Sequence, residues 1–151
     1  MATIQAFNAI RAFIEAGWPD VAPQDCPLEW DNEPIKLPQP YGPAVPGADP
    51  PPNAWGRVLI DGDLWEQAGI GTGSPDTDRW EETGSLMLFV FAPVNSGSRL
   101  NRELLTAFAE MCRGQDIGGI EFQDIRFDPI GAKDDTGSWW SMHIVIDWKR
   151  G

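Results

Sequence analysis

The single histidine and the two cysteines are the residues of this chain that catalysis most often uses. His143 falls in the middle of a predicted strand, where a general base would need a nucleophile within reach. No nucleophile stands at a recognisable strand-to-helix turn, so the sequence offers His143 no triad partner. Cys26 and Cys112 are too few for a disulfide framework or a four-ligand zinc site. Structural roles are therefore favoured for all three residues.

Glycine-rich and acidic turns are the other candidates for binding chemistry. Gly69, Gly71 and Gly73 are spaced like part of a phosphate-binding loop, but no Lys-Ser or Lys-Thr follows and no helix begins there. The acids at 61 and 63, and those at 134 and 135, lack the twelve-residue calcium loop that ends in Glu. We therefore expect solvated turn acids rather than a metal site, and the sequence does not favour an enzyme.

Composition excludes several further classes. The chain has 151 residues, which predicts one domain over 1–151, and it is 42% hydrophobic, enough for one core. Its 23 acidic and 11 basic residues give a net charge of −12, which argues against a basic nucleic-acid footprint. No apolar run approaches the roughly 20 residues of a membrane span, and the first residues do not resemble a signal peptide. A cytosolic, acidic domain with no membrane contact is expected.

Apolar spacing predicts two helices. The first covers 3–16, with Thr3 as its cap and with a glycine and Trp18-Pro19 as its end. The second covers 98–113, with Ser98 as its cap and Gly114 as its terminator. Their expected buried stripes are Ile4, Phe7, Ile10 and Ile14 in the first helix, and Leu100, Leu104, Ala107, Phe108 and Met111 in the second.

Proline dominates the segment 19–53 that follows the first helix. It holds 11 of the 14 prolines, which remove amide donors and make a continuous strand ladder implausible. A short strand over 28–30 is compatible with this composition. An extended, polyproline-like arm and a plain linker are equally weighted interpretations of the remainder.

Alternating or continuous apolar residues predict the strands, all within 54–150. Within the predicted strand 79–92, the apolar run 86–91 fills both faces, which predicts an interior strand covered on each side. The expected strands are 54–67 with a bend at Gly62, 79–92, 120–127 with a bulge at 123–124, and 139–148 after a polar loop at 131–137. The expected fold is α+β, with a mostly antiparallel sheet of about four to five strands packed against two helices.

Eight tryptophans are more than the core of so small a domain needs. They are Trp18, Trp30, Trp55, Trp65, Trp80, Trp139, Trp140 and Trp148. Tryptophan buries a large area with few rotatable bonds and is enriched at protein interfaces. Some of these residues are therefore expected to anchor a partner or a second copy, while others close the core.

Several segments together resemble a known family. WGRV begins one predicted strand at Trp55, RWEETG introduces the next at Arg79, and LMLFVFAPVNSGSRLNRELLTAFAEMCR joins that strand to the second helix. The tryptophan-rich SWWSMHIVIDWKR ends the chain. In element order, size and strand starts, residues 3–150 resemble the tail terminator proteins of long-tailed, lambda-like bacteriophages and the corresponding parts of phage-derived gene transfer particles.

The resemblance implies a homohexameric ring that caps the tail tube, ends its polymerisation and meets a head-side neck protein. It implies no cofactor and no catalysis, assembly in the host bacterial cytoplasm, and a place at the tail–neck junction of the virion. DNA would pass through the channel without specific binding, and acidic protein repels its phosphates. Acidic surface that serves only solubility is an equally weighted alternative.

Individual residues are assigned to this ring as expectations. The strand start at 79–82 is expected to pair with arginines of a neighbouring subunit. The interface candidates are Arg57, Trp65, Arg79, Trp80, Glu81, Glu82 and Arg126, and the channel-facing candidates are Asp61, Asp63, Asp134 and Asp135.

Three other functions remain open at this stage. A neck or head-completion component would have similar properties. A small acidic enzyme or ligand-binding domain would place tryptophans around a pocket. An adaptor or inhibitor would use its acidic surface to mimic nucleic acid.

Overall fold

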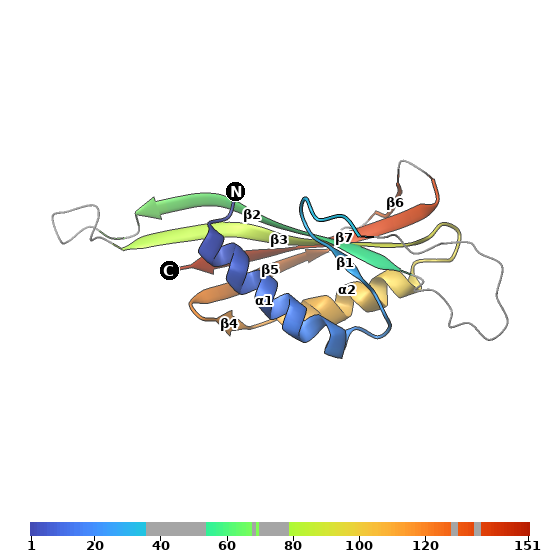
Figure 1. The fold of residues 1–151 in the computed structure, drawn as a ribbon, viewed down its shortest axis with the longest axis horizontal. Coiled ribbons are helices and arrows are strands. Elements are labelled where there is room, and N and C mark those ends of the chain that lie inside the picture. The colour runs from blue at the N-terminus through green and yellow to red at the C-terminus, as the bar shows by residue number, and fades with distance from the viewer. Residues whose placement is uncertain (36–53, 68, 70–78, 128–129, 135–136) are drawn as a thin grey trace.

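Two helices cover one face of a curled β-sheet (Figure 1). The structure is a computed structural model that describes residues 1–35, 54–67, 69, 79–127, 130–134 and 137–151. The helices are α1 (Ile4–Val21) and α2 (Arg99–Cys112). The strands are β1 (Leu28–Glu29), β2 (Trp55–Gln67), β3 (Trp80–Pro93), β4 (Asp116–Ile117), β5 (Ile120–Phe127), β6 (Ala132–Lys133) and β7 (Trp139–Arg150). The predicted α+β class is confirmed.

Among the described residues the sheet has seven strands, in the order β1-β2-β3-β7-β5-β4, and β6 pairs with the free part of β7. β1 runs parallel to β2, and the other pairs are antiparallel. The predicted number of four to five strands was therefore wrong, and the parallel β1–β2 pair makes the sheet a mixed one. Strands of two residues, such as β4 and β6, are too short to show a period of two, and no local pattern reports parallel pairing.

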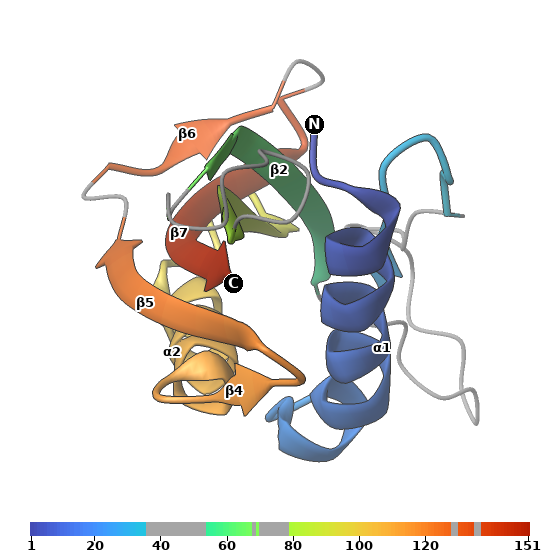
Figure 2. The ribbon, with the colours of Figure 1, turned by 90° about the vertical axis from the view of Figure 1, so that its left-hand side faces the viewer.

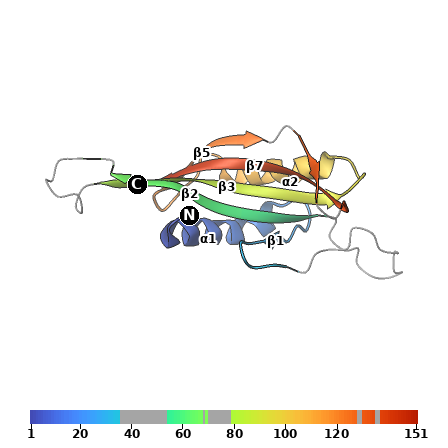
Figure 3. The ribbon, with the colours of Figure 1, turned by 90° about the horizontal axis from the view of Figure 1, so that it is seen from above.

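The main core lies between the helices and the inner face of the sheet, which is the face that they cover. The end-on view shows the sheet curling around this side, and the view from above shows both helices behind the strands (Figures 2 and 3). Its fully buried residues include Ile10, Ile14, Leu86, Leu88, Leu104, Phe108, Ile144, Ile146 and Trp148. The apolar alternation predicted for the last strand is confirmed.

The outer face of the sheet has no helical layer among the described residues. Met87 and Phe89 are only half-buried there, so the prediction that their strand is covered on each side was wrong. Aromatic side chains shield one another instead. Trp55 stacks on Phe91 at 4.1 Å between ring centroids, and Trp139 meets Trp55 edge-on. This second cluster explains why a strand with one covered face is apolar on both.

α1 continues past the predicted end at residue 16. Pro19 lies in its last turn, where a missing N–H removes one helical hydrogen bond. Gly17 is helical and serves close packing, since a Cβ there would lie 3.0 Å from Met111 Sδ. The buried Trp18 holds the last turn down through its Nε1–H, which donates to Cys26 O at 3.0 Å. Packing therefore overrides the local stop signals.

The buried stripe of α1 is also displaced by a fraction of a turn from the predicted one. Ile4 is 62% exposed, whereas the buried residues are Ala6, Ile10, Ile14 and Trp18. The predicted N-cap is confirmed, because the Ala6 N–H donates to Thr3 Oγ1.

The ends of α2 match the predicted boundaries, with one difference in chemistry. Ser98 occupies the N-cap position, but its hydroxyl accepts from Arg102 Nε rather than from a backbone N–H. Gly114 has φ +71°, as expected of a glycine that ends a helix. Both predicted bulges are confirmed as register shifts, after Gly62 in β2 and after Phe122 in β5.

Part of the proline-rich segment is described. Its first residues end α1, and Leu28–Glu29 forms β1, close to the predicted strand over 28–30. Residues 36–53 lie outside the described residues, so the extended arm there stays a prediction. No helix in the described part of the chain has the length and hydropathy needed to cross a membrane.

Candidate functional site

The tryptophans divide sharply between core and surface. All eight lie in the described part of the chain; five are buried and Trp140 is half-buried. Trp65 and Trp80 are 58% and 39% exposed. The core interpretation therefore holds for most of the set, and any role as partner anchors falls on these two residues.

Trp65 and Trp80 lie on what we call the hairpin end, defined as residues 63–67 of β2 and 80–83 of β3. Register pairs Trp65 with Glu82 and Gln67 with Trp80, so both indoles project from the inner face of the sheet. Their rings meet edge-to-face at 6.2 Å. Leu64, 53% exposed, lies on the opposite face. The hairpin end extends beyond the helical layer (Figure 1), so its aromatic side chains have no core to enter.

The hairpin end is also acidic. Asp63 and Glu66 are exposed, and neither forms an ion pair within the described part of the chain. Asp61 lies just before it, with Oδ1 3.3 Å from the N-terminal ammonium of Met1. Exposed aromatic side chains, and carboxylates that form no ion pair among the described residues, therefore lie together on the hairpin end.

Glu82 is committed inside the chain. It is 2% exposed, accepts from the Thr3 N–H and hydroxyl at 2.7 Å each, and accepts from Arg150 Nε at 3.1 Å. Burial by itself would raise the pKa of Glu82, but these three donors outweigh it and hold the pKa below its usual value. Glu82 thus fastens the start of α1 and the end of β7 to β3. A surface role for it would require this site to open.

The other charged interface candidates have partners in their own chain. Arg57 pairs with Glu29 at 3.0 Å, and Arg126 pairs with Asp147 at 2.6 Å, both on the outer face. Arg79 pairs with Glu81 at 3.0 Å, and Lys149 Nζ lies 3.2 Å from the same carboxylate. Arg57 and Arg126 lie away from the hairpin end, whereas Glu81 belongs to it, on the face opposite Trp65 and Trp80. Their role in pairing with a neighbour stays a prediction.

The channel-facing candidates lie at opposite ends of the sheet. Asp61 pairs in register with Ser85, whereas Asp134 Oδ1 accepts from the N–H of Trp139, which pairs with Pro93. Eight residues of strand separate these levels, roughly 27 Å. Asp135 lies outside the described residues. Within one chain, the acids therefore form no single patch.

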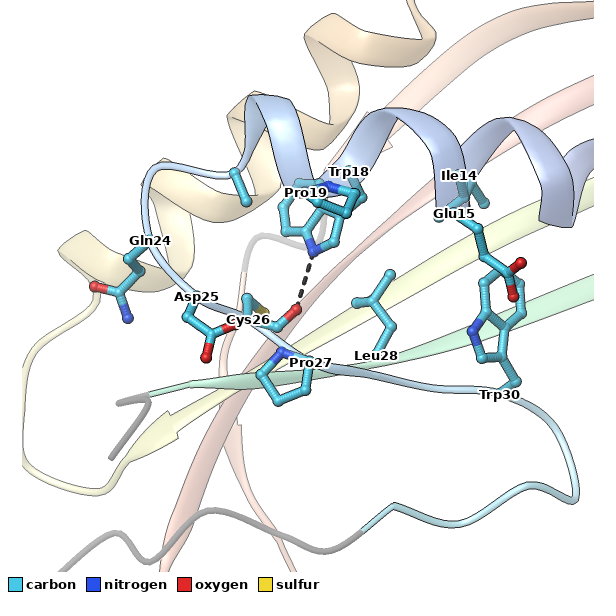
Figure 4. Close-up of a pocket in the computed structure, with 11 residues that line it drawn as sticks. Ile14, Glu15, Trp18, Pro19, Gln24, Asp25, Cys26, Pro27, Leu28 and Trp30 are labelled. Atoms are coloured by element: carbon cyan, nitrogen blue, oxygen red, sulfur yellow. Dashed lines mark hydrogen bonds between the residues drawn. The ribbon is translucent and has the colours of Figure 1, made fainter. Parts of the chain in front are cut away.

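A cavity of about 580 Å³ lies between α1 and the segment that leads into β1 (Figure 4). Trp18, Leu28 and Trp30 supply apolar walls, and Glu15 and Asp25 lie among its lining residues. Burial raises the pKa of the Cys26 thiol, which also lines the cavity, to about 12. A thiol that stays protonated at neutral pH is a poor nucleophile. The cavity therefore offers apolar binding rather than thiol chemistry.

The remaining chemical candidates do not converge. No three His, Cys, Asp or Glu residues among those described are placed to hold a metal ion. His143 is half-buried on the outer face and stacks on Phe89 at 4.7 Å. Burial raises the pKa of Cys112 to about 12. Gly71 and Gly73 lie outside the described residues.

Sequence reasoning missed a groove at the end of the sheet opposite the hairpin end. This end groove, about 580 Å³ in volume, is lined by residues of β6, β7, α2 and the turn after β3, among them Val94, Arg102, Ile130, Lys133, Trp140 and Met142. Its lining comes from four separate stretches of the chain, so no local pattern could have indicated it.

Comparisons with known proteins bear on the fold. No family model and no curated protein matches the chain. Seven chains of solved structure are similar to it. One of these, a protein whose name states no function, superposes with a TM-score of 0.61 at 15% identity, over 96% of this chain and 95% of its own. The arrangement of helices and sheet described above is therefore similar to a solved fold of nearly the same extent.

Proposed function

We propose that this protein is a structural virion subunit of the tail terminator type, in a long-tailed bacteriophage or a phage-derived gene transfer particle. Six copies form a ring at the tail–neck junction after assembly in the host bacterial cytoplasm. The ring caps the tail tube, ends its polymerisation and meets a head-side neck protein. The function is assembly, without catalysis or a cofactor.

The observation that carries the proposal is the hairpin end. Two exposed tryptophans and an exposed leucine lie on strands that extend beyond their own helical layer. Exposed indole is enriched where proteins meet, because it buries a large area at low cost in side-chain entropy. A projection of this kind suits a neighbouring subunit, and a closed ring requires such unlike surfaces to meet.

Charge supports the same proposal. Six copies of a chain with net charge −12 carry −72 in total. A ring of that charge repels DNA phosphates, which favours passage of DNA without specific binding.

Light scattering and negative-stain imaging of the purified protein, alone and mixed with tail tube protein, test the proposal. We expect a closed ring of six subunits and tubes that stop growing once the ring is added. A ring that binds the head-side neck but leaves tube growth unchanged would favour a neck or head-completion protein. A strict monomer without effect on tube length would refute the proposal.

A ligand-binding domain is the second candidate, and the tryptophan-lined cavity beside α1 favours it. This function predicts that a small apolar ligand raises the melting temperature of the wild-type protein. Replacing Trp30 by alanine, which opens one wall, should abolish that shift. The ring proposal predicts no such shift.

A further inference from the structure

The exposed side chains at the two ends of the sheet include charges of opposite sign, although Asp134 also lies at the end with the groove. Asp63 and Glu66 are exposed at the hairpin end, while Arg102 and Lys133 are exposed beside the end groove. Within the described residues, neither of these two cations forms an ion pair. Among the described residues, each end therefore presents charged side chains that form no ion pair.

The end groove has the apolar character that an aromatic projection needs. Trp140 and Met142 contribute to it from the inner face of β7, and Ile130, 74% exposed, stands beside them. Gly131 keeps the groove in shape, because a Cβ there would lie 1.9 Å from the Trp140 ring. The end groove thus combines apolar side chains with nearby cations, and the hairpin end combines exposed indoles with nearby carboxylates. The two surfaces are complementary.

The hairpin end cannot reach the end groove of its own chain. The two lie at opposite ends of β3 (Figure 1), and Trp80 and Pro93 are the first and last residues of that strand. Thirteen residue steps at about 3.4 Å give roughly 44 Å. A second copy of the chain can bring the two surfaces together.

We propose that the hairpin end of one copy docks in the end groove of the next. Trp65 and Trp80 lie against Ile130 and Trp140 of the neighbour, and Asp63 and Glu66 face its Arg102 and Lys133. This inference deepens the proposed function and rests on it for the closed form of the assembly. Each copy both gives a hairpin end and receives one, which is the head-to-tail contact that a ring repeats.

The docked hairpin end is an anchor within a larger contact. A fully buried aromatic residue covers about 150–250 Å², so two indoles that are about half exposed add on the order of 200 Å². A stable interface buries about 800 Å² on each partner. Flanking surfaces must supply the remainder, and ring closure strengthens each contact because the last one forms within the assembly.

Charge reversal at each end tests the contact. The hairpin variant is Asp63→Lys with Glu66→Lys, and the groove variant is Arg102→Glu with Lys133→Glu. At low salt, we expect each variant alone to associate more weakly than wild type by about tenfold or more, because like charges then meet. A chain with all four changes, or an equimolar mixture of the two variants, should regain association to within about threefold.

A matched control for the hairpin variant carries the same change of net charge away from both surfaces. Asp31 and Asp124 are exposed acids outside them, so Asp31→Lys with Asp124→Lys should leave association unchanged. Circular dichroism and melting temperature establish that every variant is folded. Sedimentation velocity measures the association.

The outcomes separate this inference from the proposed function. A six-membered ring that ignores both reversals, or variants that weaken association without rescuing each other, overturn the inference and leave the ring in place. If the combined variants regain association but form only a dimer or an open chain, the docking is supported and the closed ring is refuted. A wild type that stays monomeric at every concentration overturns the inference, and the tube-growth assay then decides the function separately.

Discussion

The two halves of the β2–β3 hairpin differ in what covers them. In the half beneath the helices, Val58, Leu86 and Leu88 are at most 1% exposed. In the outer half, Trp65 and Trp80 point from the same face of the sheet and remain on the surface. Both halves carry apolar side chains on this face, and those of the outer half lie beyond the helical layer. One strand pair therefore contributes to the core at one end and leaves two indoles on the surface at the other.

The boundary between the halves is a pair of glycines. Gly62 faces Gly84 across the two strands, and Trp148 packs directly against this point. A Cβ at Gly84 would lie 2.1 Å from Asp61 O and 2.4 Å from the Trp148 ring. The buried Trp148 ring therefore ends the covered half, and the exposed Trp65 and Trp80 lie just beyond it.

The largest expected effect is on the covered side of this boundary. Trp148→Ala should lower the free energy of unfolding by about 3–5 kcal/mol, because it empties a fully buried site. Urea unfolding at pH 7 measures the change. Trp80→Ala is the matched control from the exposed half. Equal losses of unfolding free energy in the two variants would contradict the difference between the covered and the exposed half.

Glu82 is a buried residue of the outer half, bonded to the start of α1 and the end of β7, and its removal should have the next largest effect. Glu82→Gln loses charged hydrogen bonds from Thr3 and Arg150, which we expect to cost about 2–3 kcal/mol at pH 7. Glu66→Gln, an exposed change on the same hairpin, should cost far less.

The same site should make stability depend on pH. The pKa of Glu82 is lowered in the folded chain, so its stabilisation is complete above the unfolded value of about 4.3 and is lost as pH falls through the folded value. Unfolding of wild type and Glu82→Gln should therefore converge as pH drops from 7 to about 3. A constant difference across that range would show that the carboxylate charge is not the source.

Replacing Asn101 measures how much its hydrogen bonds to the strands stabilise the packing of α2 over the covered half. It is fully buried, and its Nδ2 donates to Val90 O at 2.9 Å and to Trp140 O at 3.3 Å. Asn101→Ala leaves these carbonyls short of a donor and should cost about 1–3 kcal/mol in urea unfolding. Thr106→Ala, an exposed change on the same helix, is the comparison. If Asn101→Ala left the free energy of unfolding unchanged, apolar packing alone would hold α2 against the sheet.

The smallest effect on stability is expected at the hairpin end. Trp65→Ser with Trp80→Ser should change the free energy of unfolding by about 1 kcal/mol or less, since only one edge-to-face contact and exposed surface are lost. The same double variant should fail to form rings in light scattering. Intact rings would show that the exposed indoles are not the anchor.

Local pattern was enough for the long elements. Alternation in residues 139–148 and the apolar run 86–91 predicted two strands that meet in the core, because periodic burial leaves a periodic sequence. Local pattern did not reveal the end of α1, where the packing of Trp18 outweighs Pro19. It also did not reveal Glu82, since its partners Thr3 and Arg150 are 79 and 68 positions away along the chain.

The site was predicted less well for a related reason. An excess of tryptophan pointed to an interface, but nothing in the sequence distinguishes Trp139, buried in the outer cluster, from Trp80 on the surface. That distinction depends on where the helical layer stops and on aromatic contacts between distant strands. The end groove has the same origin, because it exists only once four stretches of chain have come together.

The difference in exposure among the tryptophans affects the fluorescence of the protein. Five of the eight emitters are buried and a sixth is half-buried, so a neutral collisional quencher such as acrylamide reaches mainly Trp65 and Trp80. The quenchable fraction of the native fluorescence therefore reports on these two side chains without any added label. If the hairpin end docks in a second copy as proposed, this quenchable fraction should decrease as protein concentration rises.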